Sequence, residues 1–245
     1  MGVYCGEQKV LKMKPFTIII PVYNEEKLIV QNTKKLISYL KHFKTPYEII
    51  LGSNGSTDST LDLALKLKKK YPKKIKVISF KNKGVGRVFR KGVEDAKYNQ
   101  IISADMDLSV DLNFIRRALE LFRQYDIIVG SKKMGHQERS FLRKIPSTVF
   151  IFLVRVLLGL KYKDYSMAAK AYKRDAIINH IHKTDYGSSY VIDLIYYAKR
   201  DSKKMIEIPV KCIDKRKSKF NLYNEIFYRF NNLIKLWIKN LFYFI

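Results

Sequence analysis

The sequence predicts an α/β domain with a mostly parallel sheet and helices on both of its faces. Short apolar, β-branched stretches alternate along the first half of the chain with segments of helical periodicity, which is the pattern of strand and crossover-helix units. A chain of 245 residues with 47% hydrophobic and 13% aromatic residues can bury the core of one compact domain. No internal repeat or flexible linker divides it.

Five strands are expected in the first half, each a short apolar run. They are residues 17–22, 47–51, 75–80, 100–104 and 126–130. Helices are expected between them, marked in turn by Leu28, Ile29, Leu36, Ile37 and Leu40; by Leu61, Leu63, Leu65 and Leu67; by residues 88–96; and by Leu112, Ile115, Leu119 and Phe122.

Ligands of parallel sheets bind at the carboxyl ends of the strands. The polar turns that follow Val22, Leu51, Phe80 and Ala104 are therefore expected to form one site. The second half of the chain has a different character, with an apolar helix at residues 147–160, a strand-like stretch at 168–173, a helix at 190–199 and a strand at 205–210. A basic loop and an aromatic-rich helix follow.

The net charge of +26 predicts a surface that attracts polyanions, namely nucleic acid, anionic lipid headgroups or phosphorylated substrates. Charge alone does not distinguish these partners. A lysine run such as residues 65–74 is also typical of a solvated helix face with no partner at all. No recognition helix, zinc site or aromatic RNA-binding motif favours a nucleic-acid-binding protein, so no nucleic-acid partner is expected.

The cysteines and the N-terminus bear on location. Cys5 and Cys212 lie far apart without metal-ligand spacing, which indicates a reducing compartment. No apolar run precedes Phe16, so neither a secretory signal nor a spanning segment is expected there, and activity on the cytoplasmic face is predicted.

Two carboxylates, Asp105 and Asp107, follow the strand at residues 100–104 in the segment ADMDLS. On a turn that leaves a strand, side chains at i and i+2 can reach one divalent cation, and Mg²⁺ or Mn²⁺ prefers such oxygen ligands together with substrate phosphates. Such a cation neutralises charge on a leaving diphosphate. A glycine-rich segment at residues 82–92, NKGVGRVFRKG, adds glycines that permit close approach of a ligand and basic residues that suit a diphosphate.

Six segments occur in the order typical of glycosyltransferase family 2: TIIIPVYNEE, LGSNGSTDST, NKGVGRVFRKG, SADMDLS, GSKK and LLGLKYKD. Within that family the chain most resembles the dolichyl-phosphate mannose and glucose synthases, which are polyprenyl-phosphate glycosyltransferases. The resemblance runs from about Phe16 to about Asn221. It implies a GT-A fold, inversion at the anomeric carbon, a Mg²⁺ or Mn²⁺ cofactor, a nucleotide-sugar donor and a polyprenyl or dolichyl phosphate acceptor.

The resemblance also implies roles for individual residues. Asp105 and Asp107 match the metal pair, and Arg143 and Ser147 match a pair near the reacting phosphates, so Asp107, Arg143 and Ser147 are the expected catalytic residues. The expected donor contacts, beyond the metal pair, are Pro21, Tyr23, Glu25, Asn54, Arg90, Met106, Ser109, Lys132, Arg216 and Lys219.

Three positions depart from the family pattern. Ser53 and Asn54 stand where the family often has Asp-Asp, so the nucleotide base is left open. Ser109 stands where a Gln or similar group can join the metal, and Ala168 with Ala169 replaces a Gly-Phe pair. The donor is expected to be GDP-mannose, with UDP-glucose as the alternative.

The acceptor decides whether a general base is needed. A hydroxyl requires one, whereas a lipid monophosphate with a second pKa of about 6 arrives already anionic. A phosphate acceptor instead requires cations, for which Arg90, Lys132, Arg143 and Lys219 are available. The alternative is a family 2 transferase that acts on a glycan hydroxyl with Asp193 as base; otherwise Asp193 positions its helix.

The terminal segment, residues 227–245, predicts attachment to an anionic membrane surface. Arg229, Asn232, Lys235 and Lys239 recur on one helical face, while the other faces carry Phe230, Leu233, Leu236, Trp237 and Leu241. A helix in the membrane interface keeps such a basic stripe and a spanning helix does not; a helix packed on the core is the alternative. We therefore expect a catalytic domain at residues 1–221, an amphipathic helix at 222–245, and monotopic or peripheral attachment to which residues 147–160 contribute.

Overall fold

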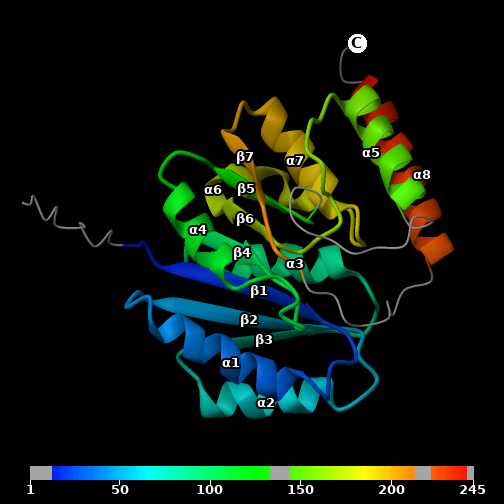
Figure 1. Ribbon diagram of the computed structural model, residues 1–245. Helices are drawn as coiled ribbons and strands as arrows, with labels where there is room; N and C mark the ends of the chain where they lie inside the picture. The colour runs from blue at the N-terminus through cyan, green and yellow to red at the C-terminus, as the bar shows by residue number, and fades with distance from the viewer. Residues whose placement is uncertain (1–12, 133–143, 213–221, 242–245) are drawn as a thin grey trace, which may run out of the picture.

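The computed structural model describes residues 13–132, 144–212 and 222–241, and its strands form one seven-stranded sheet (Figure 1). The strand order is β3-β2-β1-β4-β6-β5-β7, and among these strands only β6 runs antiparallel to its neighbours. The strands are β1 (Phe16–Val22), β2 (Tyr47–Asn54), β3 (Ile75–Phe80), β4 (Gln100–Ser103), β5 (Ile127–Ser131), β6 (Lys170–Lys173) and β7 (Met205–Pro209). The expected mostly parallel sheet is confirmed.

Helices cover both faces of this sheet, each face with its own apolar core. The core on one face includes residues of α1 (Ile29–Lys41), α2 (Thr60–Lys70) and α4 (Asn113–Leu121). The core on the other face includes residues of α3 (Val85–Asp95), α5 (Lys144–Leu158), α6 (Arg174–Ile177), the 3₁₀ helix η3 (Ile178–Lys183), α7 (Tyr190–Arg200) and α8 (Leu222–Leu241).

The central strand β1 shows why its sequence is apolar throughout. Ile18 and Ile20 belong to one core and Ile19 to the other, and all three are fully buried. Successive side chains of a strand point to opposite faces, so a strand covered on both sides needs an unbroken apolar run.

Two elements differ from the sequence-based expectation. Strand β2 continues past Leu51 to Asn54, because Ser53 and Asn54 pair in parallel with β3, although their small polar side chains indicated a turn. Helix α2 buries Ala64 and leaves Leu65 42% exposed. The expected helix is present, but leucines at every second position cannot share one helix face, and of the four leucines that marked it only Leu67 is buried.

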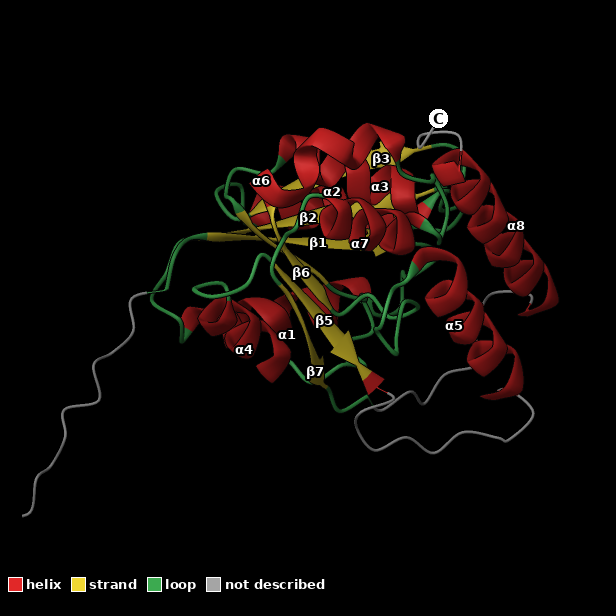
Figure 2. Cartoon of the chain, turned by 90° about the horizontal axis from the view of Figure 1, so that it is seen from above, coloured by secondary structure: helices red, strands yellow, loops and turns green. Residues whose placement is uncertain are grey.

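The second-half helices α5 and α8 lie side by side at one flank of the domain (Figure 2). The Phe150 and Phe230 rings meet edge to face with centroids 5.3 Å apart. Leu233 and Leu236 of α8 are buried in the same core as α7. Burial of each such leucine is worth about 1.5–3 kcal/mol, which fixes α8 on the domain.

The expected orientation of α8 was therefore wrong in part. Leu233 and Leu236 face the protein, and Trp237 is partly buried. On the stripe expected at lipid headgroups, Arg229 hydrogen bonds Glu225 (2.7 Å) and Ser188 (3.3 Å), and Asn232 contacts Ser189 (3.4 Å). The sequence pattern identified an amphipathic helix, but the docking partners on α7 and the loop before it decide which face turns inward.

A different set of apolar side chains faces solvent on this helix pair. In α8 they recur at steps of seven, four and three residues, and in α5 at steps of three and four, so each set occupies one helix face. We call this surface the α5–α8 apolar face; it comprises Val149, Phe152, Val156, Phe227, Ile234, Ile238 and Leu241, which are 40–77% exposed. Within the described ranges, no helix is long and apolar enough to cross a membrane.

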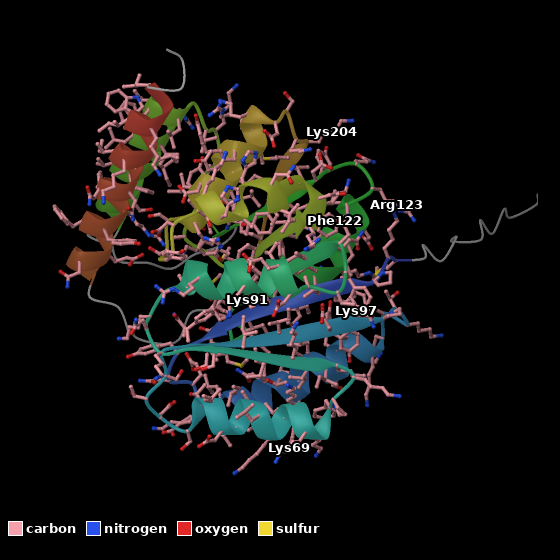
Figure 3. All side chains as sticks on the ribbon, turned by 180° about the vertical axis from the view of Figure 1, so that it is seen from behind. Lys69, Lys91, Lys97, Phe122, Arg123 and Lys204 are labelled. Carbon is pink, nitrogen blue, oxygen red and sulfur yellow. The ribbon has the colours of Figure 1, made fainter. Side chains whose placement is uncertain are left out.

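The lysine-rich surface is solvated, as its pattern indicated. Lys69 on α2 and Lys91 on α3 project outward from the domain, as do Lys97 and Lys204 in the connecting segments (Figure 3). Phe122, which directly follows α4, is by contrast buried. The run at residues 65–74 accordingly contributes charge to the surface and no site of its own.

Candidate functional site

The turns after β1 and β2 are joined at the carboxyl edge of the sheet. The Asn24 N–H donates to Ser56 Oγ (3.2 Å), the Thr57 N–H donates to Asn24 Oδ1 (2.9 Å), and the Glu25 N–H donates to Thr60 Oγ1 (2.7 Å). Asn24 adopts a left-handed conformation with φ 52°. These bonds fix the segment that was expected to contact a nucleoside.

Asn54 connects this segment to the glycine-rich segment, residues 82–92. Its buried side-chain oxygen accepts the Gly84 N–H at 2.5 Å. The Lys83 ammonium lies 4.2 Å from the centre of the Tyr23 ring, a cation–π contact. Tyr23, Asn54 and Lys83 thus meet at one corner of the edge, where Pro21 pairs with Gly52.

The glycine-rich segment binds protein where a ligand was expected. The N–H groups of Gly86 and Arg87, at the start of α3, donate to the carbonyls of Gly187 (3.1 Å) and Tyr186 (3.0 Å). A Cβ on Gly86 would lie 2.2 Å from the Asp185 carbonyl oxygen. The close approach that Gly86 permits is to the loop at residues 184–189. A ligand contact by the rest of the glycine-rich segment stays a prediction.

Arg90 takes part in the same docking. Its guanidinium donates to Glu94 (3.2 Å), the His182 carbonyl (3.1 Å) and the Tyr186 hydroxyl (3.4 Å). These contacts fasten α3 to η3 and the following loop. A donor contact by Arg90 stays a prediction, and Lys83 is the basic residue of this segment that lies beside Tyr23.

Asp105 and Asp107 follow β4 as expected. Desolvation by the surrounding protein raises the pKa of Asp105 to about 6, and the Asp107 charge adds to the rise. The Asp105 side chain is still open to solvent. One Asp107 oxygen accepts the Ser109 N–H (3.0 Å), and the buried Met106 carbonyl accepts the Asn32 side-chain N–H (2.9 Å). These bonds shape the turn, in which Leu108 is left-handed with φ 51°.

The carboxylate pair fits a divalent cation that is shared with a substrate. Within the ranges that the structure describes, no group of three or more His, Cys, Asp or Glu side chains could hold a metal. Mg²⁺ commonly takes one or two protein carboxylates and completes its shell with phosphates and water. Desolvation is the main cause of the raised Asp105 pKa, and the Asp107 charge adds to it; a bound cation would relieve the repulsion between the two carboxylates.

Two buried lysines lie behind the pair. Lys132 is 8% exposed and Lys170 is fully buried, and both charges act to lower the Asp105 pKa. Lys170 donates to the carbonyls of Met167 (2.8 Å) and Gly130 (3.2 Å), and burial lowers its pKa to about 8. Lys132 was expected at the site, whereas Lys170 was missed; a lysine in the apolar run AAKAYK was the available signal, because lysine is rarely buried without partners.

Asp164 completes this buried layer. Its carboxylate accepts N–H groups from Lys132 (3.3 Å), Ser166 (2.9 Å) and Met167 (3.3 Å). Burial acts to raise the pKa of Asp164, but the charges of Lys170 and Lys132 and these hydrogen bonds hold it below its usual value. Asp164 was also missed as a site residue, although the segment LLGLKYKD contains it.

Four expected residues lie elsewhere or outside the described structure. Arg143, Arg216 and Lys219 fall outside the described residues. Ser147 lies in the first turn of α5 and is partly exposed. The roles expected of these residues stay predictions.

Asp193 is buried on α7, and its carboxylate accepts the Asp185 N–H at 2.6 Å. Asp185 in turn accepts the N–H groups of Gly187 (2.9 Å) and Ser189 (3.0 Å) and the Tyr228 hydroxyl of α8 (2.6 Å). Burial raises the pKa of Asp193 to about 7, the Asp185 charge adds to the rise, and Lys239 opposes it. The geometry gives Asp193 a structural partner, the loop that docks on α3.

A cavity of about 20 Å³ lies next to Asp105, between β4 and α4. It has room for about one water molecule. Its lining is mostly apolar, and its volume is far below that of a pocket for a small-molecule ligand.

Comparison with known proteins shows what the chain is similar to. The family model described as Glycosyl transferase family 2 matches residues 17–181. The dolichyl-phosphate beta-glucosyltransferase of Drosophila melanogaster is 27% identical over 92% of this chain and 75% of its own length. The dodecaprenyl-phosphate galacturonate synthase of Rhizobium johnstonii is 27% identical over 66% of this chain and 48% of its own length.

The undecaprenyl-phosphate 4-deoxy-4-formamido-L-arabinose transferase of Pectobacterium carotovorum is 28% identical over 69% of this chain and 52% of its own length. The chain thus spans about half the length of several relatives that it matches.

Solved structures share the fold. Mannosyl-3-phosphoglycerate synthase from Rubrobacter xylanophilus matches with a TM-score of 0.68 at 10% identity, over 94% of this chain and 75% of that one. Glucosyl-3-phosphoglycerate synthase from Mycobacterium tuberculosis, in complex with Mn²⁺ and UDP-glucose, matches with a TM-score of 0.62 at 13% identity, over 87% and 75%. These likenesses confirm the expected GT-A arrangement.

Substitution of one member of the acidic pair tests the metal site directly. Asp107→Asn keeps the oxygen that accepts the Ser109 N–H but removes one anionic ligand, so Mn²⁺ affinity should fall by at least about tenfold. Electron paramagnetic resonance of free Mn²⁺ measures this. The control is Asp111→Asn, which removes a nearby charge and should bind Mn²⁺ as the unsubstituted protein does. Equal losses in both variants would mean that Asp107 contributes only general charge.

The raised pKa of Asp193 makes stability depend on pH. The unfolded carboxyl has a pKa of about 4 and the folded one about 7, so the native state retains this proton longer, and the free energy of unfolding should fall as pH rises from about 4 to about 7. Asp193→Asn removes this contribution and should flatten the profile, as measured by urea denaturation at pH 5 and pH 8. The exposed Asp62→Asn variant is the control, and identical profiles for the two variants would contradict the prediction.

Proposed function

This chain belongs to glycosyl transferase family 2, and from that premise we propose that it transfers a sugar from a nucleotide-sugar donor to a polyprenyl phosphate at a membrane surface. The observation that carries the proposal is the pair Asp105 and Asp107 at the carboxyl edge, next to the corner formed by Tyr23, Asn54 and Lys83. Names of three relatives point the same way, because each is a polyprenyl- or dolichyl-phosphate sugar transferase or synthase.

The chain's own residues supply an anion-binding edge. A divalent cation held by Asp105 and Asp107 would neutralise charge on the leaving diphosphate. Lys132 and Lys170 add fixed positive charge behind the pair, and Lys83 brings an ammonium group next to Tyr23. Positive charge that is already in place costs no reorganisation when negative charge develops during transfer.

The acceptor is proposed to be a phosphate and not a hydroxyl. A phosphomonoester is already anionic and needs no general base. Asp193, the candidate base, is 7% exposed, and one of its oxygens holds the Asp185 N–H. Its pKa of about 7 would suit a base, so transfer to a glycan hydroxyl is the second candidate function.

The donor is proposed to be GDP-mannose, with UDP-glucose as the alternative. The Asn54 side-chain oxygen accepts the Gly84 N–H, which leaves the amide N–H groups to donate to a base. Guanine and uracil both present a carbonyl oxygen to such a donor. Of the three relatives compared, one carries glucose in its name, and for this reason both donors belong in one assay.

The α5–α8 apolar face is proposed as the surface that contacts the membrane. Its seven exposed side chains lie on two adjacent helices, and Lys235 and Lys239 of α8 are also exposed. Apolar side chains flanked by lysines suit the headgroup boundary of an anionic bilayer. We keep residue 222 as the boundary between the catalytic domain and the membrane-contacting helix, because α8 begins there. The side of α8 that carries Leu233 and Leu236 packs on the domain. The cytoplasmic side stays a prediction from sequence.

A transfer assay tests the function. Labelled GDP-mannose and UDP-glucose are each incubated with a polyprenyl phosphate and Mg²⁺ or Mn²⁺, and products are extracted into organic solvent. Labelled lipid should form with GDP-mannose, and product with UDP-glucose alone would select the alternative donor. Asp193→Asn should retain activity within about tenfold, because loss of a true general base costs about 10²–10⁴-fold.

Two results of this assay would contradict the proposal. One is full activity of the Asp107→Asn variant. The other is transfer only to a glycan hydroxyl combined with loss of activity in Asp193→Asn, which would establish the second candidate.

Membrane attachment is tested on the exposed side chains. Phe152→Ser combined with Ile238→Ser should weaken binding to anionic vesicles by at least about tenfold, because each large apolar side chain contributes on the order of 1.5 kcal/mol when buried. Leu65→Ser is the control, because Leu65 is also 42% exposed but lies on α2. Cosedimentation measures binding, and raised salt should release only part of the protein. Unchanged binding of the double variant would assign attachment to another surface.

A further inference from the structure

A second cavity lies between η3, α7 and α8, and no step of sugar transfer uses it. Its volume is about 110 Å³, several times that of the cavity beside Asp105. Six of its lining residues carry the chemistry: His180, Lys183, Tyr197, Arg200, Asp201 and Lys239. A hollow of this size has room for a small polyatomic anion.

The charge of the lining is positive. Lys183, Arg200 and Lys239 contribute three cations, against the single carboxylate of Asp201. That carboxylate is engaged, with Asp201 Oδ2 2.8 Å from His180 Nε2. A second carboxylate, Asp193, is close enough for Lys239 to lower its pKa, but it does not line the cavity. The balance favours an anion over a cation or an apolar ligand.

The wall of the cavity holds His180 in one orientation. The imidazole stacks on the Tyr197 ring with centroids 4.8 Å apart and planes 12° apart, and the Lys183 ammonium lies 5.8 Å from the same ring. Within the described part of the chain, His180 Nδ1 is buried and has no hydrogen-bond partner. A buried ring nitrogen without a partner costs free energy. Because Nε2 faces the Asp201 carboxylate and carries a proton there, Nδ1 is a donor in the imidazolium form of His180, and an anionic oxygen bound in the cavity would accept that N–H.

The cavity is distinct from the carboxyl edge. Tyr190 opens α7 near Asp105, whereas Arg200 closes the helix at the cavity, about 15 Å further along its axis. The cavity borders α8 at Lys239, next in sequence to Ile238 of the α5–α8 apolar face. It therefore lies at the margin of the surface proposed to meet a membrane.

We propose that this cavity is a phosphate-binding site, in which Lys183, Arg200 and Lys239 surround the anion and His180 donates to one of its oxygens. Guanidinium and ammonium groups suit phosphate, and three of them line this one cavity. A lipid headgroup phosphate and free phosphate present the same chemistry here. This site is independent of the proposed sugar transfer, because the cavity is separate from the carboxyl edge where donor and acceptor are proposed to bind.

The His180 ring reports on the site directly. Inorganic phosphate is titrated into the full chain without donor or metal, and the imidazole carbon-bound proton is followed by NMR, with His180→Gln identifying the signal. The His180 signal should shift and saturate. In Lys183→Gln/Lys239→Gln the affinity should fall by at least about tenfold. Lys68→Gln/Lys69→Gln removes two charges from the exposed face of α2, whose residues do not line the cavity, and should leave the affinity unchanged.

A second arm separates the two sources of phosphate. Cosedimentation uses phosphatidylcholine vesicles with and without phosphatidate. A headgroup site is identified if Lys183→Gln/Lys239→Gln binds phosphatidate vesicles more weakly than Lys68→Gln/Lys69→Gln does. The difference should be absent on phosphatidylcholine alone and should disappear when inorganic phosphate is added. A site for free phosphate is identified if the Lys183→Gln/Lys239→Gln variant and its control bind vesicles equally while phosphate still shifts the His180 signal of the unsubstituted protein.

The proposal is overturned if phosphate leaves the His180 signal of the unsubstituted protein unmoved. It is equally overturned if Lys183→Gln/Lys239→Gln binds phosphate as tightly as Lys68→Gln/Lys69→Gln does. Single Lys239→Gln serves as a second variant should the double one fail to fold, which a thermal denaturation curve establishes. Failure of sugar transfer would not alter either reading.

Discussion

The rest of the structure depends on the parallel pairing of β1 with β2 on one side and β4 on the other. Its register sets Val22 beside Ser53 and Ile19 beside Ser103, and the Ala104 N–H extends the ladder to Ile19 at 3.1 Å. The turns that follow these strands therefore leave from one edge, though they come from segments about eighty residues apart. A slip by one residue would exchange the two faces of a strand and bury the wrong set of side chains, so the cores on both faces hold the site in register.

The turn after β4 holds two negative charges, Asp105 and Asp107, and lysines from later in the chain offset them. Two carboxylates at one turn repel each other, and the protein places Lys132 and Lys170 behind them. Lys170 is fully buried, which is costly unless the ammonium has partners; the carbonyls of Gly130 and Met167 and the charge of Asp164 provide them. The antiparallel strand β6 thus carries charge as well as sheet pairing, because it brings Lys170 opposite Ser103 at the end of β4.

The sequence was informative where local chemistry decides the outcome. The apolar run of β1 and the position of Asp105 and Asp107 after a strand follow from periodicity and strand-end chemistry, and the structure contains both. The sequence was uninformative where a residue's contacts are made with a segment far away in the chain. Gly86 permits a close approach, but nothing near it in sequence says that the approaching group is the Asp185 carbonyl. In the same way, Leu233 and Leu236 have the period of any amphipathic helix, and only the packed domain shows that they face inward.

The loop at residues 184–189 connects the parts of the molecule that have separate tasks. Its carbonyls accept the first N–H groups of α3, its Asp185 N–H is held by Asp193 of α7, and its Asp185 carboxylate accepts Tyr228 of α8. Because Gly84 precedes α3 and donates to Asn54, a few consecutive contacts connect α8 to the corner where Tyr23, Asn54 and Lys83 meet. Movement of α8 relative to the sheet would have to break these bonds or move the bonded groups with it, so the position of α8 and the shape of the carboxyl edge are linked through the loop at residues 184–189.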